Sequence, residues 1–236
     1  LGLSAVNNGK GLMLYALGSM AWSHAYLAGA EALRWAVLSL LMWLGIQTFT
    51  RERLPLLLAG IHLGAVIASL WTSLQFWFDF GLFPQGPNPA STFVNRNFFA
   101  EFVLTSLPFS ALLLARAQRT RHVLVLALSN AWCVLALLMT GTRSATVSLL
   151  LLAVLVPALL WRLREQLEIA TWTPAQRRGV LAIFLLTLGG LGLVGSGNPK
   201  INAEHGPGQH VSALERSFQR TSKVALPSEY TQGSFS

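Results

Sequence analysis

The chain has 236 residues, of which 53% are hydrophobic and only 11% are charged, whereas charged residues make up about 25% of an ordinary soluble domain. This composition excludes a disordered chain and a collagen, and the single cysteine, Cys133, excludes an intrachain disulfide framework and a cysteine-based metal site. The net charge of +8 does not indicate nucleic-acid binding, because the basic residues lie in small groups between long apolar runs. The composition therefore predicts an all-α, polytopic membrane protein.

Apolar runs long enough to cross a bilayer, which takes about 20 residues, recur along the whole chain. In chain order they cover residues 11–28, 32–49, 54–78, 98–115, 123–140, 145–161 and 180–196. We therefore expect a bundle of about seven transmembrane helices over residues 1–196, and the polar residues 197–236 as the start of an external loop or domain. Because the chain begins at Leu1 and ends in this polar stretch, we expect a fragment of a longer protein.

The basic residues alternate between successive loops. One set comprises Lys10, Arg51, Arg53, Arg116, Arg119, Arg121, Arg162, Arg164, Arg177 and Arg178, and the opposite short loops hold Arg34, Arg96 and Arg143. Positively charged short loops stay in the cytoplasm, so the chain is expected to start inside and end outside. The outward face then consists of a turn at residues 28–33, the irregular loop 79–97, the tight turn 141–144 and the tail from residue 197.

Arg96 and Arg143 lie on the side where the charge bias opposes them, each next to an apolar helix. A guanidinium group there suits an anion such as phosphate, which it binds with two parallel hydrogen bonds. Asn95 and Asn97 flank Arg96, and Glu101 follows one turn later on the same helix face as Asn97. The alternatives are that Asn95 caps the helix, that Glu101 pairs with either arginine, and that both arginines bind lipid headgroups.

The histidines carry less information. His62 lies between Gly60 and Gly64, a spacing typical of close helix packing. His205 and His210 occur in Gly- and Pro-rich sequence, which favours solvated residues over general bases. No metal-ligand spacing or phosphate-binding loop is present, so we expect neither a metal ion nor another cofactor.

Two segments resemble motifs of one known family. Residues 91–102 read S-T-F-V-N-R-N-F-F-A-E-F and are followed by Leu107 and Pro108, which resembles the G-T-F-x-N-x-N-x-x-A-x-x-L…P segment of the O-antigen ligase and polymerase-like family. Residues 139–145, M-T-G-T-R-S-A, resemble that family's T-G-S-R-G-A turn. Both motifs occur in the expected order and at the expected distance, and the similarity extends over residues 10–196.

This resemblance implies a glycosyltransferase of the GT-C type in the bacterial inner membrane, with its active face in the periplasm. Such enzymes move a glycan from undecaprenyl diphosphate, without a metal ion, to lipid A core sugar, a protein or another glycan chain. Arg143 and Arg96 would hold the diphosphate and stabilise the leaving group. Asn95, Asn97 and Glu101 would position the arginines or the first sugar.

The family's general base is a histidine in a large periplasmic loop, with a Gly-rich motif downstream. Neither His205 nor His210 stands in that context, and Arg216 and Arg220 are further loop arginines without an assigned counterpart. We therefore expect the full-length protein to be active and this segment alone to be inactive.

A transporter or flippase for an anionic, lipid-linked substrate is the alternative function, in which the same arginines would line a path. Transporters usually place their polar sites near the middle of the bilayer. Here the polar residues gather at the ends of the spans, which favours the transferase. A membrane scaffold also fits the composition but leaves Arg96 and Arg143 unexplained.

Overall fold

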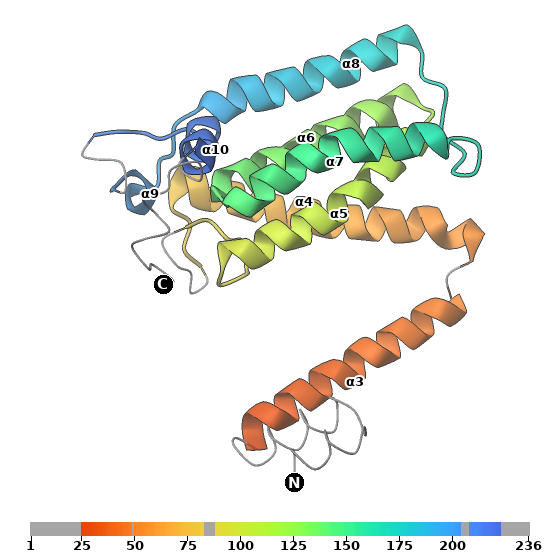
Figure 1. The fold of residues 1–236 in the computed structure, drawn as a ribbon, viewed down its shortest axis with the longest axis horizontal. Helices are drawn as coiled ribbons and strands as arrows, with labels where there is room; N and C mark the ends of the chain where they lie inside the picture. The colour runs from red at the N-terminus through yellow and green to blue at the C-terminus, as the bar shows by residue number, and fades with distance from the viewer. Residues whose placement is uncertain (1–24, 49, 83–87, 204–207, 223–236) are drawn as a thin grey trace. The chain divides into compact units, whose positions relative to one another are not determined.

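The computed structural model of the protein describes residues 25–48, 50–82, 88–203 and 208–222 (Figure 1). The chain divides into two units, residues 1–54 and residues 55–236. The first unit contains helix α3 (Ala25–Thr48) and the short 3₁₀ helix η1 (Arg51–Arg53). The turn predicted at residues 28–33 is wrong, because α3 runs through it without a break. Alanine and leucine favour the helix there, and Gly29 does not interrupt it. Most of the span predicted at residues 11–28 lies outside the described residues.

Four long apolar helices follow: α4 (Leu54–Phe78), α5 (Arg96–Arg116), α6 (Thr120–Thr140) and α7 (Arg143–Arg162). By length and composition these four, within the described part of the chain, can cross a membrane. At about 1.5 Å per residue each spans the roughly 30 Å of a bilayer's hydrocarbon core. The described residues of the chain contain no strand beyond one isolated bridge between Gly195 and Ser212. An all-helical, membrane-type fold is thus confirmed, with four such helices where seven spans were expected.

The span predicted at residues 180–196 is helical but irregular. Helix α8 (Pro174–Leu185) continues into the π-helix η2 (Leu186–Gly190) and the 3₁₀ helix η3 (Leu191–Leu193). It starts earlier than predicted, because Thr173 and Gln176 form a capping box around Pro174. The tail then forms two shorter helices, α9 (Pro199–Ala203) and α10 (Ala213–Ser222).

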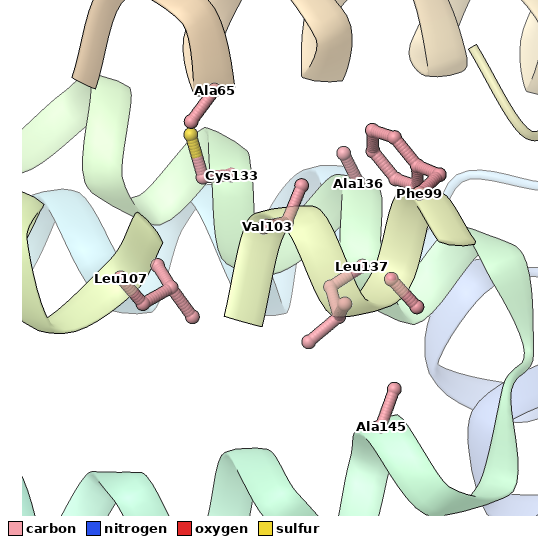
Figure 2. Packing of buried hydrophobic residues seen from close by; sticks show 9 residues of the cluster. Ala65, Phe99, Val103, Leu107, Cys133, Ala136, Leu137 and Ala145 are labelled. Carbon is pink, nitrogen blue, oxygen red and sulfur yellow. The ribbon is translucent and has the colours of Figure 1, made fainter. Parts of the chain in front are cut away.

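Helix α6 is the centre of the second unit, and 56% of its most apolar 18-residue stretch is buried inside the molecule. Figure 2 shows one core cluster in which Ala65 of α4, Val103 of α5, Cys133 of α6 and Ala145 of α7 come together. A second cluster joins α4 and α6 to α9 and α10, and a third joins α5 and α6 to α8. The surrounding helices therefore pack on α6, while the outer faces of the long helices α4, α5 and α7 are apolar and exposed, as the membrane interior requires.

The connecting segments of the second unit gather at two ends. At one end, which we call the basic end, the Ala170 amide donates to the Ala115 carbonyl (2.9 Å) and Trp172 Nε1 donates to the Ala117 carbonyl (3.0 Å). The turn between α5 and α6 and the segment between α7 and α8 therefore lie side by side. The other end, which we call the tail end, holds the turn at Gly141 and the described parts of the loop 79–95 and of residues 195–222.

Candidate functional site

The tail end is built on the last turn of α4, where Gln75 is fully buried. Its Nε2 donates to the Ser91 carbonyl (2.9 Å), and its Oε1 accepts from the amides of Ala90 (3.0 Å) and Ser91 (2.8 Å). One side-chain amide thus satisfies three backbone groups of the loop. Ser91 has a left-handed backbone, with φ of 57°, so this side chain holds a strained turn in place. The loop that precedes α5 is thereby fixed to α4.

The tail is attached to the same turn of α4. The Ser196 hydroxyl donates to the Phe76 carbonyl (2.7 Å) and Asn198 Nδ2 donates to the Gln75 carbonyl (2.9 Å). The last carbonyls of a helix have no partner within it, so these side chains supply one. Between them, a Cβ on Gly197 would collide with the Trp77 carbonyl oxygen, and only glycine allows this approach.

Helix α10 lies against the ends of α6 and α7 (Figure 1). Its first turn is capped by Ser212, whose hydroxyl accepts from the Glu215 amide (3.2 Å). One turn further, the Ser217 hydroxyl is 2.9 Å from the Thr146 hydroxyl of α7. Ala213 and Arg216 are 0% exposed. The docking of α10 therefore carries an arginine side chain into the interior of the tail end.

Asn88 brings two arginines together. Its Oδ1 accepts from Arg96 Nη1 (3.0 Å) and also from Arg216 Nη2. Two hydrogen bonds to one oxygen place these nitrogen atoms within about 6 Å of each other. An anion bound beside both guanidinium groups would accept hydrogen bonds from each, and phosphate, like a carboxylate, matches the paired donors of a guanidinium group.

Two arginines of α10 also lie over the turn between α6 and α7. Gly141 caps α6 with φ of 63°, and a Cβ built on it would meet Arg216 Nε at 2.7 Å and Arg220 Cδ at 3.1 Å. Arg216 and Arg220 are one helical turn apart and share this face of α10. The turn that resembles the second family motif therefore lies directly beneath two guanidinium-bearing side chains.

The two motifs contact each other. The Thr142 hydroxyl donates to Asn97 Oδ1 at 3.5 Å, a long hydrogen bond. The Thr140 hydroxyl holds Thr142 in place, 3.1 Å from its hydroxyl and 3.2 Å from its amide. Arg143 is the next residue and begins α7, with its side chain partly exposed. The segment around Arg96 and the turn before Arg143 are thus neighbours, although 45 residues separate Asn97 from Thr142.

The structure places the other predicted residues as follows. Asn95 caps α5, since its side chain accepts from the Asn97 amide (2.9 Å), which confirms the capping alternative for that residue. Arg96 is the first residue of α5. Glu101 is exposed, and its carboxylate makes no hydrogen bond or ion pair with any described residue. Its pairing with Arg96 or Arg143 is therefore not seen, and its role toward a substrate stays a prediction.

Asn88, Arg216 and Arg220 are not among the site residues predicted from the sequence. The spacing of the two tail arginines by four residues, which places them on one helix face, was the available signal. Nothing local indicated that Asn88 would join Arg96 to a residue 128 positions away.

Of the histidines considered from the sequence, His62 and His210 make polar contacts in the structure, and His205 lies outside the described residues. His62 Nε2 is 2.8 Å from the Ser129 hydroxyl and links α4 to α6. A Cβ on Gly64 would be in ordinary contact with Phe102, at 3.7 Å, whereas a Cβ on Gly60 would meet nothing within 4 Å, so the close packing predicted from this spacing is not seen at Gly60. His210 Nδ1 is 3.0 Å from the Ser196 carbonyl. Within the described ranges, no three His, Cys, Asp or Glu side chains lie close enough to hold a metal ion.

No protein family, curated protein or solved structure shows significant similarity to the chain.

Proposed function

We propose that this chain is the membrane portion of a glycosyltransferase that moves a glycan from undecaprenyl diphosphate to lipid A core sugar, a protein or another glycan chain. The reaction takes place at the tail end, which faces the periplasm of a bacterium with the spans in the inner membrane. The proposal includes the finer architecture of about seven spans in a GT-C-like arrangement. It is supported by the two motifs and by their contact at Thr142 and Asn97.

The observation that carries the proposal is the shared hydrogen-bond acceptor. Asn88 joins Arg96, which begins a membrane-type helix, to the buried Arg216 of the tail. Guanidinium groups from distant parts of the chain therefore concentrate positive charge where apolar spans end. A lipid-linked diphosphate requires this arrangement, because its polyprenyl chain lies in the bilayer while its phosphates lie at the rim.

The chemistry needs this positive charge. Transfer breaks the bond between the sugar's anomeric carbon and the diphosphate oxygen, which keeps the electron pair. The acceptor hydroxyl forms the new bond to that carbon and gives its proton to a general base. Charge therefore grows on the leaving diphosphate, and donors already in place stabilise it without reorganisation. Arg143 and Arg96 supply this stabilisation, while Asn95, Asn97 and Glu101 position the arginines or the first sugar.

Reconstitution tests the proposal. The full-length protein is placed in liposomes with an undecaprenyl diphosphate-linked glycan and an acceptor, and the release of undecaprenyl diphosphate is measured. Arg143→Gln and Arg96→Gln should each reduce transfer about 100-fold to 1000-fold, the usual cost of one such donor. Arg162→Gln is the matched control, because it removes the same charge at the basic end.

Two results would overturn the proposal. One is unchanged transfer by both variants, each inserted at the normal level. The other is movement of the labelled donor across the bilayer without any glycan transfer, which would identify a flippase instead.

A further inference from the structure

The basic end contains a cavity of about 540 Å³ between the end of α5 and the start of α6. Its apolar wall includes Leu113, Val125 and Leu126. Its ionisable lining residues are Arg116, Arg121 and His122, and no acidic residue is among those that line it. The volume falls within the range of about 300 to 1,000 Å³ that small-molecule sites occupy. The apolar wall thus suits a hydrocarbon chain, and the wall formed by the ionisable residues suits an anion.

Arg116 is held at this cavity by neighbouring chain. Its Nη2 donates to Glu168 Oε2 (2.7 Å) and its Nη1 donates to the Leu167 carbonyl (3.0 Å). The Glu168 carboxylate balances this one guanidinium charge. Arg121 and His122, in the first turn of α6, are exposed. Arg121 therefore supplies the positive charge that the cavity offers to a ligand, and the His122 ring adds hydrogen-bonding nitrogen.

The position of the cavity selects the kind of ligand. Arg116 is the last residue of α5 and Arg121 is the second of α6, and both helices are long and apolar enough to span a bilayer. The polar wall therefore lies at the membrane surface, and Leu113 and Val125 lie about one turn deeper along the two helices. A molecule with an anionic head and an acyl chain matches both walls in the right order.

We propose that this cavity binds an anionic phospholipid, with the headgroup phosphate at Arg121 and an acyl chain along Leu113 and Val125. Basic pockets between transmembrane helices recognise lipid phosphates through this combination of charge and apolar surface. A zwitterionic lipid would bind less well, because its own cation would face Arg121. The site is at the opposite end from the proposed transfer site and does not depend on that proposal.

Native mass spectrometry of the full chain in detergent tests this inference. Phosphatidylglycerol and phosphatidylcholine with identical acyl chains are titrated, and the bound fraction of each is measured. We expect phosphatidylglycerol to bind more tightly. Arg121→Gln should weaken that binding about fivefold, the equivalent of about 1 kcal/mol for one basic residue at a membrane surface, and should leave phosphatidylcholine binding unchanged.

Arg119→Gln is the matched control, since Arg119 is two residues away, is exposed, does not line the cavity and makes no side-chain cap to α6. A second variant, Val125→Trp, fills the apolar wall and should reduce binding of phosphatidylglycerol even with Arg121 intact. Equal effects of Arg119→Gln and Arg121→Gln would overturn the proposal, as would equal affinity for the two lipids. Binding of glycerol phosphate as tight as that of the lipid would also overturn it, because the site would then recognise a soluble anion.

Discussion

Gly141→Ala is the substitution that tests most directly whether the tail helix lies over the turn between α6 and α7. Gly141 has φ of 63°, which costs a residue with a Cβ about 1 to 2 kcal/mol. The added Cβ would also lie 2.7 Å from Arg216 Nε and 3.1 Å from Arg220 Cδ. Forcing a methyl group into packed surroundings costs about 1 to 3 kcal/mol more. We therefore expect the free energy of unfolding to fall by about 2 to 5 kcal/mol.

Substitutions at two other glycines distinguish the cost of backbone strain from the cost of the steric contact. Gly208 has φ of 79° with nothing within 4 Å of its Cβ position, so Gly208→Ala measures backbone strain alone. Gly60, inside α4, also has nothing within 4 Å, and Gly60→Ala should stabilise the helix by about 0.5 to 1 kcal/mol. Unfolding of each variant is followed by tryptophan fluorescence during titration of mixed micelles with a denaturing detergent.

A mutant cycle tests whether the destabilisation beyond backbone strain arises from the two tail arginines, Arg216 and Arg220. In an Arg216→Ala, Arg220→Ala background both close contacts are gone, so Gly141→Ala should then cost only the strain that Gly208→Ala shows. If Gly141→Ala costs no more than Gly208→Ala in the unaltered protein, Arg216 does not lie over the turn. The cluster of Arg96, Asn88 and Arg216 would then also be wrong.

Three further substitutions probe the polar contacts that hold the two ends, each measured by the same denaturation. Gln75→Leu removes all three bonds of that side chain to Ala90 and Ser91 and should cost at least about 3 kcal/mol, because each buried backbone group loses its partner at a cost of about 1 to 3 kcal/mol. Gln176→Leu breaks the capping box of α8 and should cost about 1 to 2 kcal/mol. Glu168→Gln should cost less than about 1 kcal/mol, because the carboxylate is 74% exposed and its ion pair with Arg116 is screened by solvent.

Gln47→Leu is the control for the two glutamine variants, because Gln47 is exposed in α3 and should change stability little. A loss for Gln75→Leu no larger than that for Gln47→Leu would contradict the interpretation of Gln75 as the residue that fixes the loop. A large loss for Glu168→Gln would mean that its pair with Arg116 is more enclosed than the structure shows.

The long helices could be predicted because apolar length is a local property. The expected span 54–78 coincides with α4, and the spans 98–115 and 123–140 lie within α5 and α6. Helix α5 begins two residues earlier and ends one residue later than predicted, and α6 begins three residues earlier. The errors occurred where a local signal was misjudged. Gly29 lies inside a continuous helix and not in the predicted turn, and α8 begins at a capping box around Thr173, before the predicted start at residue 180.

The tail end could be predicted only in part, because its contacts join residues far apart in the sequence. The rim position of Arg96 and Arg143 followed from the order of apolar and basic segments. The contact of Asn88 with Arg216 and that of Ser196 with Phe76 span 128 and 120 residues. No period or local motif encodes such pairs, and they exist only once the helices have packed on α6.

Polar side chains at the ends of the apolar helices therefore decide which chain segments meet. Hydrophobic burial explains why the spans pack around α6. It is not specific for one apolar surface over another, so it does not determine which loop contacts which helix end. Gln75 and Asn198 make that selection, because the backbone groups at the end of α4 need partners that only certain segments supply. Glycine at 141 and 197 then permits the close approach. The position of Arg216 beside Arg96 thus follows from backbone hydrogen bonding at one helix end, which hydropathy does not record.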